Sequence, residues 1–248
     1  MFWNADVKRG NQAAKECLDV GIRILAEAKG LRDNKPDAKL GKVMEVLLTF
    51  PFSSEVQRAA ETISFLTGGF DTTGYTLAWT LYELARHPEE QTALASDLST
   101  DSQPPRLTRV VNEAMRLWPV VSGGGIRVAS RDFVCSDGVV IPKGSDVSFP
   151  LYGSYRQPWI HDADQFMPAR WCDDAPQVGE LREAFAPFNR GRRACIGQTH
   201  ALLTIKLTIA HLVRKYEWSV LEEPTPTYFL TLKPEGLRLK VKKRVAQN

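Results

Sequence analysis

Apolar residues recur at helical spacing through the first third of the chain. The helical pattern extends from residue 7 to residue 31, and the helix is expected to stop at Gly30, a residue typical of helix ends. A loop at 33–36 and a shorter helical run at 43–48 follow. Residues 1–50 are therefore expected to form N-terminal helices.

The longest periodic stretch begins at Ser54 and runs to Arg86. Ser54 and Gln57 have the spacing of a capping box, which satisfies free N–H groups at a helix start. The pair His87-Pro88 stops the helix, because proline disfavours helical backbone in the residue before it. At about 1.5 Å per residue such a helix is roughly 50 Å long. It is expected to cross a whole large domain.

Helical and extended patterns alternate after this helix. A loop is expected at 97–105, a second helix at 106–118 and strands at 126–149. An irregular segment at 151–194 precedes a last long helix at 197–216, and short strands close the chain. The pattern predicts a mainly α (α+β) fold with a long central helix and small β-sheets.

Composition excludes several classes of protein. The chain is 43% hydrophobic and 25% charged, and its net charge of +3 gives no argument for nucleic-acid binding. The basic tail at 237–244 alternates apolar and charged residues, which is typical of a strand with one solvated face. The four cysteines are widely spaced and form no C-x-x-C pair, so neither a zinc site nor a disulfide framework is expected.

Targeting signals are not evident in the sequence. In residues 1–10 charged residues come before any apolar run, unlike in a signal peptide. No stretch reaches the ~18 uninterrupted apolar residues that a membrane helix needs. No transmembrane or signal segment is therefore expected in this chain, and its location stays unknown.

The decapeptide FNRGRRACIG, at residues 188–197, is the densest cluster of chemical signals. Cys195 lies directly before the last long helix, where the partial positive charge of the helix N-terminus stabilises a thiolate. Gly191 and Gly197 permit tight backbone turns and leave room for a flat ligand. Arg193 can offer a cation to an anionic ring substituent. A lone cysteine is usually a packing residue, but this combination favours a ligand.

This decapeptide resembles the F-x-x-G-x-R-x-C-x-G signature of the cytochrome P-450 superfamily, the haem-thiolate monooxygenases. The resemblance implies haem b, with Cys195 as the axial ligand of the iron and with Phe188, Gly191 and Arg193 around the cofactor. Thiolate donation favours O–O cleavage in this family. The resemblance extends from about residue 43 to residue 244 and corresponds to the C-terminal half of family members.

Two glycines and two threonines interrupt the middle of the long helix, in GGFDTT at residues 68–73. Each glycine destabilises a helix by roughly 1 kcal/mol relative to alanine, so the presence of two glycines here needs an explanation. One reading is a packing kink in which Thr72 bonds back to a carbonyl. The segment also resembles the family's A/G-G-x-D/E-T-T motif, which implies that Asp71 and Thr72 relay protons to dioxygen.

Glu113 and Arg116 are three residues apart beside an apolar helix face. Such a pair on an exposed helix is worth only ~0.2–0.5 kcal/mol. Here it resembles the family's E-x-x-R pair, which implies a third partner, Arg170 in the segment FMPARW. A buried charged network of this kind needs every member satisfied, and its expected role is structural.

Arg127 follows the glycine run at 123–125 and enters the strand region. An arginine at the start of a strand is usually solvated, but the resemblance makes it a second partner of a haem propionate, since a planar guanidinium suits carboxylates. The residues expected to face substrate are Phe65, Gly69, Thr73, Val120 and Val121.

By resemblance the whole chain, 1–248, is a single partial domain of the family. Within it, 51–119 holds the oxygen-activation and E-x-x-R helices, 120–194 the β-rich and irregular region, and 195–248 the haem-ligand helix and closing strands.

The activity implied is insertion of one oxygen atom of O2 into a small, lipophilic organic substrate. Electrons would come indirectly from NAD(P)H, through an acidic-faced redox partner of the flavin reductase or ferredoxin type. The resemblance allows a membrane anchor facing the cytosol in a full-length relative. Two alternatives stay open: a truncated protein that binds no haem, and a family member that isomerises peroxides or dehydrates its substrate.

Overall fold

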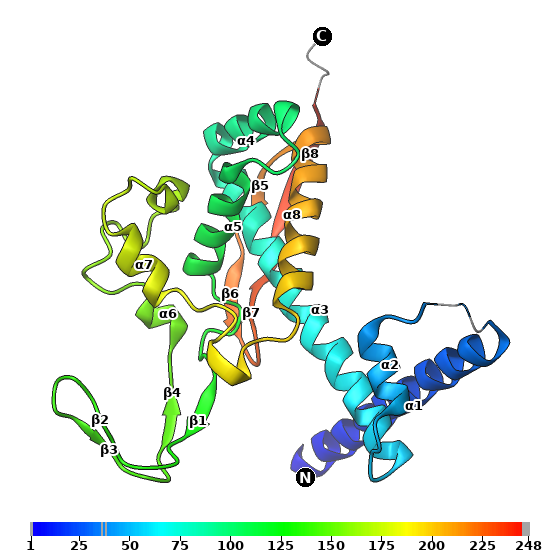
Figure 1. The fold of residues 1–248 in the computed structure, drawn as a ribbon. Helices are drawn as coiled ribbons and strands as arrows, with labels where there is room; N and C mark the ends of the chain where they lie inside the picture. Colours follow the sequence, from blue (N-terminus) through cyan, green and yellow to red (C-terminus); the bar gives the residue numbers. More distant parts are fainter. Residues whose placement is uncertain (1, 36, 38, 245–248) are drawn as a thin grey trace. The chain divides into compact units, whose positions relative to one another are not determined.

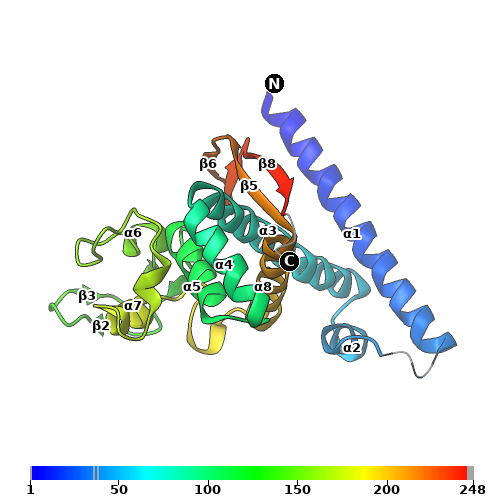
Figure 2. The same cartoon turned by 90° about the horizontal axis from the view of Figure 1, so that it is seen from above.

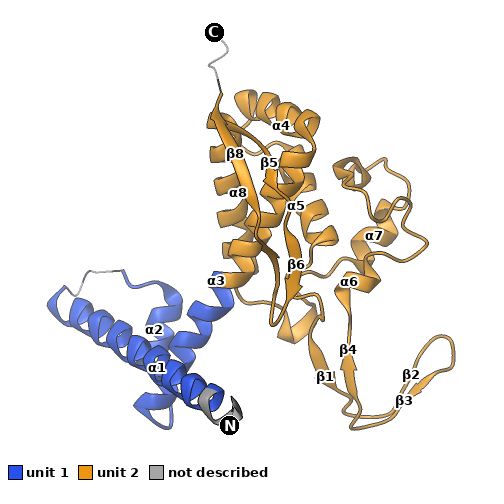
Figure 3. Ribbon diagram, turned by 180° about the vertical axis from the view of Figure 1, so that it is seen from behind, with its two compact units in different colours: residues 1–70 blue, residues 71–248 orange. Residues whose placement is uncertain are grey.

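The computed structural model describes residues 2–35, 37 and 39–244, which divide into two compact units, residues 1–70 and residues 71–248 (Figures 1 and 3). The prediction of a single partial domain stays a prediction, since each unit is described by itself. No helix among the described residues is long and apolar enough to span a membrane.

The unit of residues 1–70 is built from helices. It contains α1 (Phe2–Asn34), α2 (Lys42–Thr49) and the first part of α3 (Glu55–Arg86). A small core of buried apolar side chains holds these helices together: Leu25, Ala28, Leu47, Leu48 and Ala59. The expected N-terminal helices are present.

The prediction that the first helix stops at Gly30 is wrong, because α1 continues to Asn34. Gly30 does not adopt the left-handed conformation with which glycine usually ends a helix. Its cost of about 1 kcal/mol inside a helix is offset by the burial of Leu25 and Ala28 in the preceding turns.

The start and end of α3 agree with the sequence pattern. The Gln57 N–H donates to Ser54 Oγ at 3.1 Å, as in a capping box, while the Gln57 amide oxygen accepts from the Ser53 N–H instead of that of Ser54. The helix ends at Arg86, directly before His87-Pro88. It is a continuous α-helix through the two glycines of GGFDTT.

The unit of residues 71–248 packs four helices around one large core (Figures 1 and 2). These are the rest of α3, α4 (Pro88–Thr100), α5 (Pro105–Leu117) and α8 (Gln198–Lys215). Figure 2 shows α5, α4 and α8 gathered beside α3. The core is filled mainly by aliphatic side chains of these helices, among them Leu84, Leu94, Val110, Val111 and Ile209.

The loop predicted at 97–105 is too long, because α4 extends to Thr100. Leu98 is only 2% exposed and belongs to the large core. Burial of this leucine against its neighbours outweighs the weak helix propensity of the Ser, Asp and Thr residues around it.

Four antiparallel sheets of two strands each complete the described residues of this unit. β1 (Ile126–Val128) pairs with β4 (Asp146–Ser148), and β2 (Phe133–Val134) pairs with β3 (Val140–Ile141). β5 (Tyr216–Glu222) pairs with β8 (Arg238–Lys243), and β6 (Thr225–Tyr228) pairs with β7 (Leu232–Glu235). The strands expected at 126–149 and at the end of the chain are confirmed.

The segment expected to be irregular, 151–194, holds only short helical turns. They are α6 (Leu151–Ser154), the 3-10 helix η1 (Pro168–Trp171), α7 (Val178–Ala184) and the 3-10 helix η2 (Gly191–Arg193). The fold as a whole is mainly α with small sheets, as the sequence predicts.

Candidate functional site

Cys195 ends a loop that closes on itself just before α8. Its backbone N–H donates to the Phe188 carbonyl at 2.8 Å, and the Ala194 N–H donates to the Gly191 carbonyl at 3.0 Å. Gly191 has a φ of 74°, a left-handed conformation that costs glycine little because it lacks a Cβ. The cysteine is exposed and lies two residues before Gly197, the N-cap of α8. The loop therefore presents the sulfur at the positive end of a helix.

Gly197 leaves the space beside the sulfur open. Among the described residues, a Cβ built on Gly197 would approach only Cys195 Sγ, at the ordinary contact distance of 3.8 Å. Packing within the chain thus gives no reason for a glycine here. A larger side chain would stand next to the sulfur and take up space that a flat ligand of the thiolate would need.

Arg127 reaches this loop from β1. Its Nη2 approaches the Arg193 carbonyl at 3.5 Å, and its Nη1 donates to the carbonyl of the adjacent Ile126 at 2.9 Å. Arg127 and Arg193 are exposed, and neither forms an ion pair within the described part of the chain. Two cations beside one loop, without an acidic partner, favour an anionic ligand.

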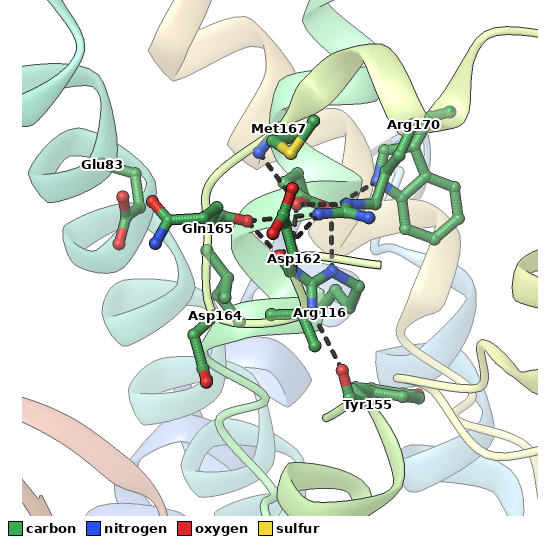
Figure 4. A network of polar contacts seen from close by, with 12 residues as sticks. Glu83, Arg116, Tyr155, Asp162, Asp164, Gln165, Met167 and Arg170 are labelled. Atoms are coloured by element: carbon green, nitrogen blue, oxygen red, sulfur yellow. Dashed lines mark hydrogen bonds and ion pairs between the residues drawn. The ribbon is translucent and has the colours of Figure 1, made fainter. Parts of the chain in front are cut away.

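Glu113 and Arg116 form a bidentate ion pair on α5 and are each 0% exposed (Figure 4). Arg116 Nε and Nη2 donate to the two carboxylate oxygens of Glu113, both at 2.9 Å. Arg116 also donates to backbone carbonyls of the following segments, at Tyr155, Ala163 and Gln165. Its guanidinium is therefore fully surrounded by acceptors.

Glu113 has three further donors, which come from or directly precede η1. Arg170 Nε donates to its Oε1 at 2.8 Å, and the Met167 N–H donates to the same oxygen at 3.0 Å (Figure 4). Trp171 Nε1 donates to Oε2 at 2.8 Å. A buried carboxylate with this many donors is well compensated for its lost hydration. The structure thus brings together the three residues of the expected network.

Trp171 was not anticipated as part of this network. It follows Arg170 directly in the sequence, but it lies outside the E-x-x-R pair and its arginine partner. Its hydrogen bond spans 58 residues, which no local pattern reveals.

The network is linked to the loop that carries Cys195. Trp171 packs on Phe185 with ring centroids 4.7 Å apart, and the Ala186 N–H donates to the Tyr155 hydroxyl at 2.8 Å. Burial raises the pKa of Tyr155 to about 12, so this hydroxyl stays neutral. Arg190, at the start of the loop, donates to the Phe185 carbonyl at 3.1 Å. Contacts of this kind fix the segment that leads into residues 188–195.

The residues expected on α3 fall in both units. Phe65 and Gly69 belong to residues 1–70 and are exposed. Asp71, Thr72 and Thr73 belong to residues 71–248 and are half-buried. Within the described residues, neither a hydrogen bond nor an ion pair joins the Asp71 side chain to the loop at 188–195, so the structure does not bring these two groups into direct contact.

Val120 and Val121 follow α5 and are half-buried. The Val120 carbonyl accepts a hydrogen bond from the Leu232 N–H of β7 at 2.8 Å. This bond ties the segment after α5 to the closing strands.

Comparisons with known proteins place the chain in a family. A family model described as cytochrome P-450 matches residues 52–242. Mitochondrial 25-hydroxyvitamin D-1 alpha hydroxylase from Rattus norvegicus is 38% identical over 174 residues, which are 64% of this chain and 34% of that protein. Cytochrome P-450 4F6, also from Rattus norvegicus, is 36% identical over 201 residues, 74% of this chain and 37% of that protein.

Solved structures agree on the fold. The crystal structure of a cytochrome P-450 matches with a TM-score of 0.78 and 24% identity, covering 93% of this chain and 56% of that one. The chain belongs to the cytochrome P-450 family, whose members bind haem through a cysteine thiolate and act as monooxygenases. It spans about a third of the length of the curated relatives it matches.

Proposed function

We propose that this chain forms the haem-binding part of a monooxygenase that inserts one oxygen atom of O2 into a small, lipophilic organic substrate. The observation that carries the proposal is the exposed sulfur of Cys195, at the end of a closed loop and beside a helix N-terminus. Arg127 and Arg193, which form no ion pair among the described residues, meet at the same loop. This donor set suits a flat, dianionic ligand whose metal takes one thiolate.

In this proposal each residue of the loop has a separate task. Cys195 Sγ would hold the iron of haem b, and Arg127 and Arg193 would neutralise its propionates. Gly191 and Phe188 would keep the loop in the closed conformation that aims the sulfur. The haem, when bound, supplies the binding and reduction of O2, with electrons that originate from NAD(P)H.

Asp71 and Thr72 favour the monooxygenase over its alternatives. The hydroxyl of Thr72 would hold a proton at Oγ1, and the carboxyl of Asp71 would replace that proton after transfer. Family members that isomerise peroxides or dehydrate substrates need no proton relay. Retention of both residues therefore supports oxygen insertion.

The reduced, carbon monoxide-bound absorption spectrum tests the proposal. The purified chain reconstituted with haem is expected to give the red-shifted band of thiolate-ligated haem. Cys195→Ala removes the thiolate and is expected to lose this band completely, because no other ligand of this type is present at the loop.

Cys17→Ala is the matched control, because Cys17 is also an exposed cysteine but lies on α1. It is expected to leave the band unchanged. A parent chain without the thiolate-type band would remove support for haem binding by this chain. A band that persists in Cys195→Ala would show that another residue holds the iron.

The redox partner is proposed to dock with an acidic surface on the side of the Cys195 loop. Arg192 is exposed there and forms no ion pair within the described residues. Arg192→Glu is expected to slow electron transfer at low salt on the order of tenfold and to weaken its salt dependence, since electrostatic steering is lost.

Lys215→Glu provides the control for this effect. It reverses an exposed charge at the far end of α8, about 27 Å along an 18-residue helix. Equal slowing by the two variants would point to a general charge effect and would contradict docking at the loop.

A further inference from the structure

Glu83 is a buried carboxylate that the proposed chemistry does not use. It lies on α3 and is 1% exposed, at the edge of the polar network in Figure 4. Its Oε1 accepts a short hydrogen bond from Trp118 Nε1 at 2.6 Å. Its Oε2 is buried and accepts no hydrogen bond within the described residues. Burial of a carboxylate in such a position costs free energy, because only one of its two oxygens gains a hydrogen bond in place of the lost water.

The charged groups around Glu83 do not compensate for this burial. From α3, Arg86 Nη1 lies 3.9 Å from Oε1, and from the N-cap of α4, His87 Nδ1 lies 3.6 Å from Oε2. The same His87 nitrogen is 2.8 Å from the Glu83 backbone carbonyl, so its proton is already directed there. From α5, Glu113 contributes charge of the same sign.

Burial raises the pKa of Glu83 above the ordinary 4.5, and Glu113 acts in the same direction. The hydrogen bond from Trp118 and the charges of Arg86 and His87 oppose the shift without cancelling it. The strength of the bond to Trp118 therefore depends on pH in a range above 4.5, because a carboxylate is a stronger acceptor than a neutral carboxyl group.

Trp118 connects this carboxylate to the segment after α5. Its ring stacks on that of Trp79 with centroids 4.0 Å apart and planes 5° apart. Trp79 Nε1 donates to the Leu232 carbonyl at 3.0 Å, and the Leu232 N–H donates to the Val120 carbonyl at 2.8 Å. Trp79 is completely buried, so its position leaves little freedom to the groups on either side.

We propose that Glu83 is a positioning residue for residues 118–121. Its carboxylate fixes the Trp118 indole, and the stack on Trp79 and the bonds of Leu232 hold Val120 in a defined place. Only the consequence for substrate rests on the proposed function, in which Val120 and Val121 face the substrate. In that case Glu83 adjusts the shape of the substrate-facing segment without touching the substrate.

Indole N–H signals in the ¹H–¹⁵N NMR spectrum of the full chain test this proposal. The Trp118 signal, assigned with Trp118→Phe, is expected to shift along a single titration whose midpoint lies above 4.5. Glu83→Gln retains an oxygen acceptor but cannot titrate, so the shift is expected to disappear. Trp218 is the internal control, because its indole donates to the Leu81 carbonyl and not to a carboxylate.

Hydrogen exchange at the Leu232 amide tests the second link. Glu83→Ala removes the acceptor of Trp118 and is expected to speed this exchange about tenfold, the order expected for loss of one hydrogen bond to a charged group. Glu83→Gln is expected to restore slow exchange. A uniformly destabilised protein would instead show faster exchange at all core amides, including those of α8.

A Trp118 signal that does not titrate, or that titrates equally in Glu83→Gln, would overturn the proposal. If the hydrogen-exchange rate of the Leu232 amide were unchanged in Glu83→Ala, the proposed link from Glu83 to Val120 would be overturned. Absence of the thiolate-type band in the parent chain is a separate result. It would remove the proposed function and leave the positioning role to be judged by the NMR data alone.

Discussion

Replacing Glu113 with alanine is expected to lower the free energy of unfolding of residues 71–248 by about 3–5 kcal/mol, the range for breaking a buried ion pair. The variant leaves the guanidinium of Arg116, which is 0% exposed, without a counter-ion. Arg170 Nε and Trp171 Nε1 lose their acceptors at the same time. Urea denaturation followed by circular dichroism measures the change.

Asp164→Ala is the matched control, because it also removes a carboxylate from an arginine. Asp164 Oδ1 pairs with Arg156 Nε at 2.9 Å, but the Asp164 side chain is 79% exposed. An exposed pair of this kind contributes about 0–1 kcal/mol. If Glu113→Ala cost no more than Asp164→Ala, the network would not have the structural role assigned to it.

Gly124→Ala is expected to disrupt the two-stranded β1–β4 sheet that carries Arg127. Gly124 has a φ of 65°, and a Cβ there would lie 2.0 Å from the Phe149 carbonyl oxygen. The left-handed conformation costs a non-glycine residue roughly 1–2 kcal/mol. The backbone shift that the clash forces adds about 1–3 kcal/mol. Hydrogen exchange of the β1 and β4 amides and the free energy of unfolding report the two effects.

Gly138→Ala separates the steric clash from the backbone preference. Gly138 has a φ of 85°, but a Cβ there would meet no described atom within 4 Å. Its variant is expected to show the conformational cost alone and to leave β1–β4 exchange unchanged. Equal effects of the two variants would contradict the argument from the Phe149 carbonyl.

The sequence predicts those elements whose limits are decided by local chemistry. The end of α3 at Arg86 follows from Pro88, and its start follows from the hydroxyl of Ser54. Residues 97–100, the last turn of α4, are expected as a loop because Ser, Asp and Thr are typical of loops, but Leu98 among them is held by tertiary packing. Local propensity and long-range burial disagree there, and burial is stronger.

The residues of the candidate site differ in the same way: local motifs predict some of them, and tertiary contacts alone reveal the others. Motif spacing identifies Cys195, Glu113 and Arg116, since each lies in a short, continuous pattern. The approach of Arg127 to the Arg193 carbonyl joins residues 66 positions apart. Glu83 has no motif at all, and its hydrogen bond to Trp118 becomes evident only when α3 and α5 are packed together. Contacts between distant segments therefore need the tertiary structure.

The four two-stranded sheets have a consequence for self-association. Within the described residues each strand pairs with a single partner, so no third strand closes the other edge of any sheet, and a second molecule can pair there wherever N–H and C=O groups are free. On β8 the charges of Lys240 and Lys242 discourage such growth, and Pro226 and Pro234 interrupt the donors of β6 and β7. Strands β1 to β4 are only two or three residues long. The longer β5 is covered at its centre, because the Trp218 N–H and C=O bond to the Gln91 side chain. Charge, proline, short length and side-chain hydrogen bonds thus each protect different edges against the formation of intermolecular sheets.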